Sequence, residues 1–189
     1  MLRPALTLLA LFTALTGLLY PALVTALAHG LFPDQAAGSL VRRDGQVLGS
    51  RLIGQTFSQP GQFWSRPSAT VPPHDASASS GSNLGPNNPR LLDAVAARLA
   101  ALRDAGVEAP VPVDLVTTSA SGLDPDLSPD AARAQIARVA QARNLPRAEV
   151  AALVERLIEP RTLALWGEPR VNVLELNLAL EALATERGK

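Results

Sequence analysis

The most constraining feature of this 189-residue chain is the stretch Ala5–Leu27, which contains no charged residue. As an α-helix with a rise of about 1.5 Å per residue it would be roughly 34 Å long, and the hydrocarbon core of a bilayer is about 30 Å thick. We therefore predict a single N-terminal transmembrane anchor within residues 1–28, a linker at 29–38 and a soluble domain at 39–189.

The flank before this stretch is short and carries Arg3 together with the chain's amino group. Short positive flanks stay in the cytoplasm, so we expect the soluble domain on the outer, periplasmic side of the inner membrane. The alternative is a cleaved signal peptide, with Ala26-Leu27-Ala28 as the cleavage site. The apolar region of a signal peptide is usually about 7–15 residues long, so the length of this stretch favours a retained, lipid-embedded anchor.

Small residues recur four positions apart inside the predicted anchor, as the pairs Ala10/Ala14 and Thr13/Gly17. Small residues at this spacing allow another membrane helix to approach closely. Ala10, Thr13, Ala14 and Gly17 are therefore candidate contacts with partner helices.

The composition excludes several classes of function. Seventeen Lys and Arg residues balance 17 Asp and Glu residues, whereas a nucleic-acid-binding protein normally carries a basic excess. The chain has no Cys and only 2 His, so disulfides, thiol catalysis and Cys-based metal sites are excluded. Hydrophobic residues make up 47% of the chain but aromatic residues only 4%, which predicts an aliphatic core.

The remainder of the sequence predicts an α+β domain. Asp44-Gly45 suits a type I′ turn between strands at Ser39–Arg43 and Gln46–Ile53. Asn88 and Pro89 predict a helix start, and Gly106 its end. The other predicted elements are a strand at Val111–Thr117, helices at Ser128–Arg143, Pro146–Ile158 and Leu174–Thr185, and a strand at Val171–Val173.

Two irregular segments are candidate partner surfaces: Gly54–Ala69, which combines aromatic residues with polar groups, and Ala78–Pro89, which is rich in polar residues. Arg66 is expected to stack on the Trp64 ring or to make a forked contact with a carboxylate. A surface arginine that shields an aromatic ring is as good an interpretation of Arg66 as a partner contact. The candidate contacts, chosen by residue type, are Phe57, Trp64, Arg66, Asn83 and Asn87.

Motifs for catalysis or metal binding are missing from the sequence. Asp124, Asp126, Ser128 and Asp130 alternate as in a calcium loop, but Pro129 and Gln135 stand where an EF-hand needs Gly and Glu. A helix cap with an acidic first turn is the better interpretation. Without a P-loop, a His-Glu-x-x-His motif or a Gly-x-Ser-x-Gly motif, we predict no catalytic residue and no metal site.

Several ordered blocks of sequence together resemble one family, the KdpC subunits of the bacterial Kdp potassium-transporting P-type ATPase. The resemblance spans the chain. The blocks are Gly49–Phe57, Phe63–Ala69, Ser79–Pro86, Asp114–Pro125 with Ser128-Pro129, Arg138–Arg143 and Gly167–Leu180.

This resemblance implies a non-catalytic accessory subunit needed for assembly and activity of a four-part complex. Its partners would be a potassium-channel-like subunit, a P-type ATPase subunit and a small peptide subunit. It further implies a catalytic chaperone that raises the ATP affinity of the ATPase subunit. Potassium would be the transported ion of the complex, and no cofactor would be bound firmly by this chain. The phosphorylation motif Asp-Lys-Thr-Gly is absent from the sequence.

Two alternatives to this role remain. One is a nucleotide-binding regulator that contacts ATP through Ser79, Ser80, Gly81, Ser82 and Asn83, a stretch similar to the signature of ABC transporters. Ser80 replaces a Gly of that signature, which weakens the assignment because Gly allows close backbone approach to phosphate. The other alternative is a periplasmic domain that gates access of potassium to the channel-like subunit.

Overall fold

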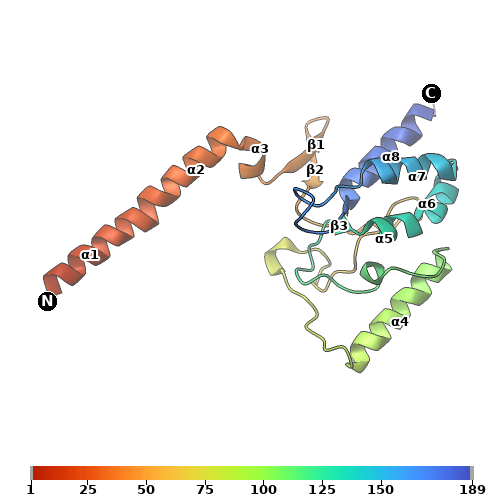
Figure 1. Cartoon of the computed structure of the whole chain (residues 1–189), viewed down its shortest axis with the longest axis horizontal. Coiled ribbons are helices and arrows are strands. Elements are labelled where there is room, and N and C mark those ends of the chain that lie inside the picture. Colours follow the sequence, from red (N-terminus) through yellow and green to blue (C-terminus); the bar gives the residue numbers. More distant parts are fainter. Residues whose placement is uncertain (1, 188–189) are drawn as a thin grey trace. The chain divides into compact units, whose positions relative to one another are not determined.

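The computed structural model describes residues 2–187, which divide between Ser50 and Arg51 into two compact units (Figure 1). Helices and short strands are mixed in the chain after a long apolar N-terminal helix. This arrangement confirms the predicted α+β class with its single N-terminal helix.

The first unit begins with one continuous helical segment, made of α1 (Leu2–Ala14), a π-helical turn and α2 (Tyr20–Leu31). The π turn covers Leu15–Leu19 and ends two residues before Pro21. Proline lacks the N–H that a regular helix needs, and such sites commonly locally widen or kink a helix. The helical segment is long and apolar enough to cross a membrane, and none of its most apolar window is buried within the chain.

A helical turn, α3 (Pro33–Ala36), leads into a β-hairpin of β1 (Leu40–Arg43) and β2 (Gln46–Ser50). Asp44 has a φ of 52° and Gly45 a φ of 78°, so both central residues of the turn are left-handed. This confirms the predicted type I′ turn. The second strand ends at Ser50 rather than at Ile53.

The second unit contains α4 (Pro89–Asp104), whose start and end follow the predicted signals. The Asn88 side chain accepts a hydrogen bond from the backbone N–H of Arg90 at 3.0 Å. At the other end Gly106 has a φ of 87°, and the N–H of Val107 donates to the carbonyl of Leu102. These contacts are those of a Schellman C-cap.

The predicted strand at Val111–Thr117 is wrong, because this stretch contains a single 3₁₀ turn at Val113–Leu115. The N–H groups of Val116 and Thr117 both donate to the carbonyl of Val113, so the backbone is satisfied locally. Proline at positions 110 and 112 also removes two of the N–H groups that a partner strand would need.

The predicted helix Ser128–Arg143 is divided into α5 (Pro129–Ala134) and α6 (Ile136–Arg143). In an unbroken helix the N–H of Gln135 would donate to the carbonyl of Ala131. Here it donates to the carbonyl of Ala132, while the side-chain Nε2 of Gln135 donates to that of Ala131. The side chain thus replaces one backbone hydrogen bond of the helix.

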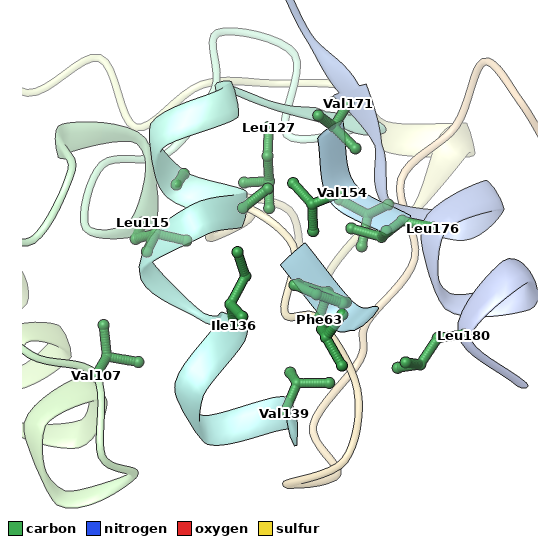
Figure 2. Packing of buried hydrophobic residues seen from close by; sticks show 14 of the residues in the cluster. Phe63, Val107, Leu115, Leu127, Ile136, Val139, Val154, Val171, Leu176 and Leu180 are labelled. Carbon is green, nitrogen blue, oxygen red and sulfur yellow. The ribbon is translucent and has the colours of Figure 1, made fainter. Parts of the chain in front are cut away.

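The other elements are α7 (Arg147–Arg156), α8 (Val173–Arg187) and the antiparallel pair β3 (Asp126–Leu127) and β4 (Val171–Asn172). Figure 2 shows the core that α5–α8 and β4 enclose around Phe63. Apart from Phe63, the fully buried cluster is aliphatic, as the composition predicts. Phe63 itself comes from the irregular segment that precedes α4.

Candidate interaction groove

Three of the predicted contact residues, Phe57, Trp64 and Arg66, line a single groove of about 370 Å³. Asn83 and Asn87 do not line this groove; both are exposed further along the chain. The structure therefore brings together the first of the two predicted surfaces but not the second. The groove is lined by Thr56, Phe57, Ser58, Trp64, Ser65, Arg66, Pro67, Ser68, Pro73 and His74.

Two buried amide side chains hold the backbone beneath the groove. Asn177 of α8 accepts from the N–H of Phe63 at 2.8 Å and donates to the carbonyl of the same residue at 3.0 Å. Gln135, between α5 and α6, does the same for Trp64, at 2.8 and 3.1 Å. Each amide thus satisfies both backbone polar groups of one residue, buried Phe63 or partly buried Trp64, as a neighbouring strand would.

Arg138 of α6 supports the same segment from below. Its guanidinium lies 4.1 Å from the centre of the Trp64 ring, and it donates to the carbonyls of Pro60 and Gln62 at 2.6 and 2.9 Å. Burial lowers the pKa of Arg138 to about 10. Arg138, not Arg66, is therefore the cation that stacks on Trp64, which corrects that expectation for Arg66.

Arg66 instead makes the predicted contact with a carboxylate, because its Nη1 donates to Oδ2 of Asp124 at 2.9 Å. Both side chains are about one-quarter exposed, at 24% and 28%. Arg66 lines both the groove and a larger cavity of about 1010 Å³ on its other side. Arg66 thus borders both depressions, while Asp124 lines the larger one.

The far wall of the groove is His74, whose Nδ1 lies 3.1 Å from Oγ1 of Thr56. Its backbone N–H donates to Oγ of Ser68, which in turn donates to the carbonyl of Gly122. Burial lowers the pKa of His74 below its usual range, so the neutral imidazole is favoured. The groove therefore offers aromatic and proline surfaces with few charges besides Arg66.

Gly54 fixes the start of the segment against the rest of the domain. Its N–H donates to the carbonyl of Leu123 at 2.7 Å. A Cβ at this position would lie only 2.5 Å from the carbonyl oxygen of Asp124 and 2.9 Å from the His74 ring. No residue larger than glycine fits there without displacement of the backbone.

The predicted nucleotide-binding residues Ser79–Asn83 run beside Ala120–Gly122. The N–H of Ser80 donates to the carbonyl of Ser121, as does the hydroxyl of Ser79. A Cβ on Gly81 would approach the carbonyl oxygen of Ala120 to 2.9 Å, so glycine here serves the close packing of two chain segments. The assignment of ATP to this stretch stays a prediction.

The larger cavity is lined by all three acidic residues of the cluster that alternates as in a calcium loop, Asp124, Asp126 and Asp130. Burial raises the pKa of Asp126, and the neighbouring Arg170 opposes that shift. Within residues 2–187 no group of three His, Cys, Asp or Glu side chains is arranged to hold a metal ion. Ser128 caps α5 as predicted, since its Oγ accepts from the N–H of Ala131.

Comparison with known sequences places this geometry in a family. Residues 2–182 match the family described as KdpC: K+-transporting ATPase, c chain. The chain belongs to the KdpC family. The resemblance found in the sequence blocks is thereby confirmed, and the chain is a subunit of a potassium-transporting ATPase.

Relatives with the name potassium-transporting ATPase KdpC subunit match over nearly their full length. The protein of Variovorax paradoxus (strain S110) is 61% identical over 98% of this chain and 98% of its own length. That of Polaromonas naphthalenivorans (strain CJ2) is 62% identical over 96% and 94%. That of Sorangium cellulosum (strain So ce56) is 61% identical over 95% and 96%.

The side chains that hydrogen-bond to the backbone beneath the groove, Gln135, Arg138 and Asn177, were not identified from the sequence. All three are buried polar side chains: Arg138 and Asn177 lie within helices, and Gln135 lies at the break between α5 and α6. The available signal is their position beside core residues: Arg138 precedes Val139, and Asn177 follows Leu176. A polar residue on an apolar helix face indicates a buried hydrogen-bonding role but does not name its partner.

Proposed function

We propose that this KdpC-family chain is a non-catalytic accessory subunit that joins the other subunits through the groove of Phe57, Trp64 and Arg66. Its helix Leu2–Leu31 is proposed to hold the chain in the inner membrane as a single-pass segment. The observation that carries the proposal is the groove itself. A large part of the domain's buried polar side chains, Gln135, Arg138 and Asn177, serves to hold its floor.

The chemistry of the groove suits a protein segment as its ligand. Interface cores are enriched in aromatic residues and arginine and depleted of other charges. Trp64 is fixed by Arg138, and Arg66 by Asp124, so both side chains are ordered before a partner arrives. Preordered side chains lose little conformational entropy on binding.

We further propose that the helix packs on partner helices through Ala10, Thr13, Ala14 and Gly17, and that the domain lies on the outer side of the membrane. The partners would be the channel-like, ATPase and small peptide subunits. The uncharged stretch Ala5–Leu27 with Arg3 before it supports this orientation. A role in assembly, and through it in the ATP affinity of the complex, follows as part of the proposal.

The test is a deletion strain that carries variants of this chain. Trp64→Ala with Arg66→Ala removes the two anchors, and Ser58→Arg blocks the groove from its exposed rim without removal of a core contact. Both are expected to abolish co-purification of the subunits and growth at limiting potassium. Thr185→Arg places the same bulk and charge at an exposed position of α8 and is the matched control. Co-purification that is unchanged by Ser58→Arg would remove the groove from the interface.

The orientation has its own experiment, which is protease protection in sealed membrane vesicles. A domain on the outer side resists protease that is added to the cytoplasmic side, while the N-terminal flank stays accessible. Digestion of the domain from the cytoplasmic side would contradict the placement and would bring ATP within reach of Ser79–Asn83.

A further inference from the structure

The turn between Arg161 and Glu168 displays large apolar side chains that no part of the described domain covers. Leu163 is 75% exposed, Leu165 73% and Trp166 64%. Neither the groove nor the larger cavity is lined by any of the three. We call residues 161–168 the Leu-Trp loop. Clustered exposed apolar residues mark contact with a membrane or another protein.

The backbone of the Leu-Trp loop is closed on itself. The N–H of Thr162 donates to the carbonyl of Trp166 at 2.9 Å, and the N–H groups of Leu165 and Trp166 donate back to the carbonyl of Thr162 at 3.1 and 3.0 Å. The N–H of Ala164 donates to the carbonyl of Arg161 at 3.0 Å. Much of the loop's polar backbone is therefore satisfied before it meets an apolar medium, where unpaired groups are costly.

The charges at the base of the loop are paired with each other. Arg161 contacts Glu168 at 2.5 Å, and Arg170 contacts Glu159 at 2.8 Å. Between these pairs the residues Leu163–Gly167 contain no charged side chain. The loop is thus an apolar tip above a neutralised polar base, a pattern that matches the boundary between acyl chains and headgroups.

The backbone conformation shows that the displayed side chains are not incidental. Leu163 and Ala164 have φ values of 51° and 60°, in the region where glycine is least strained. The chain nevertheless carries side chains at both positions. Strained conformations that persist cluster at functional sites.

We propose that the Leu-Trp loop inserts into the interface of the lipid bilayer that holds the chain's own helix. Leu163 and Leu165 would enter the acyl region, and the Trp166 ring, with its N–H, would lie at headgroup level, where tryptophan is enriched. Lipid is favoured over a protein pocket because the tip offers almost no hydrogen-bonding side chain, whereas protein interfaces carry about one hydrogen bond per 100–200 Å². The chain itself contains a helix that is long and apolar enough to cross such a bilayer.

The chain's two tryptophans give a direct test with the full-length protein in vesicles of phosphatidylcholine and phosphatidylglycerol. Trp64→Phe leaves Trp166 as the only emitter, and Trp166→Phe leaves Trp64 as the matched control. With lipids brominated near the headgroup end of the acyl chains, we expect quenching of Trp166 several-fold stronger than quenching of Trp64. Equally weak quenching of both would overturn the proposal.

A second measurement does not depend on either tryptophan variant. Because the chain has no cysteine, Leu165→Cys accepts a single nitroxide label, and Val113→Cys labels an equally exposed apolar position elsewhere in the domain. We expect the label at 165 to collide with dissolved oxygen more often than with a water-soluble nickel chelate, and the label at 113 to show the reverse. A label at 165 shielded from both reagents in the purified complex would mean burial against another subunit and would refute lipid insertion.

Discussion

Two irregular segments of the domain satisfy their backbone hydrogen-bonding groups in opposite ways. The segment from Gly54 to His74 has its backbone satisfied by distant side chains, above all Asn177, Gln135 and Arg138. The Leu-Trp loop is satisfied by its own backbone and leaves its side chains outside. The first segment therefore depends on the whole domain for its shape, whereas the second depends on a few neighbouring residues.

The largest effect is expected from removal of a side-chain clamp in the first segment. Asn177→Leu keeps the volume of the site but leaves the N–H and carbonyl of Phe63 buried without partners. Each such group costs about 1–3 kcal/mol, so the free energy of unfolding should fall by roughly 3 kcal/mol or more. Denaturant unfolding of the purified chain, followed by circular dichroism, measures it.

The matched control for this change is Asn87→Leu, which alters an exposed amide and should change stability by less than about 0.5 kcal/mol. A loss of stability for Asn177→Leu no larger than that of the control would show that the segment does not need its clamp.

A smaller loss is expected when the start of the segment is crowded. Gly54→Ala would place a Cβ 2.5 Å from the carbonyl oxygen of Asp124, and overpacking of this kind costs about 1–3 kcal/mol. Gly85→Ala is the control, since no heavy atom lies within 4 Å of its added Cβ. If thermal melting temperatures of the two variants coincide, the close approach at Gly54 is not a constraint.

In the Leu-Trp loop a substitution is expected to increase the stability of the chain instead of lowering it. Ala164 lies in the left-handed region, which costs a residue with a side chain about 1–2 kcal/mol. Part of the relief in Ala164→Gly is offset by the greater freedom of glycine in the unfolded chain. A net gain of about 0.5 kcal/mol is expected. The same change at an exposed position of α8, Ala182→Gly, should lower stability by about 1 kcal/mol. A loss of stability at both positions would contradict the strain at Ala164.

The smallest effect concerns pH and the first segment alone. Burial lowers the pKa of His74, so the folded chain holds the neutral ring while the unfolded chain already binds a proton. Stability should therefore fall as the pH drops through the ordinary histidine range near about 6.5. We therefore expect the native chain to lose stability relative to His74→Gln as the pH is lowered from about 8 to about 5. A difference that stays constant would show no such linkage.

Local signals explain which parts of the fold were predictable. Asp44-Gly45, Asn88-Pro89 and Ser128-Pro129 each determine a turn or cap from adjacent residues, and all three form as predicted. The 3₁₀ turn at Val113–Leu115 was missed because strand propensity of valine and threonine ignores the lack of a partner strand. The helix break at Gln135 arises from a side-chain hydrogen bond, which residue periodicity does not register.

Only side chains that line the candidate groove could be predicted from the sequence, and the side chains that support it could not. Phe57, Trp64 and Arg66 stand out by residue type within a short irregular segment, and the structure gathers them. Arg138, not Arg66, is the cation that stacks on Trp64, and it lies in a helix more than 70 residues further along the chain. Arg138 contacts Gln62 across a separation of 76 residues. Sequence spacing contains no information on such a contact.

The clamp on Phe63 also sets an order of events during synthesis. Asn177 follows Phe63 by 114 residues, so it leaves the ribosome late, after the helix Leu2–Leu31 and most of the domain. Until then the N–H and carbonyl of Phe63 lack the side chain that pairs with both of them. Closure of the groove is therefore a late step, and a chain that terminates before α8 would carry every aromatic residue of the groove yet lack one of the two amides that shape it.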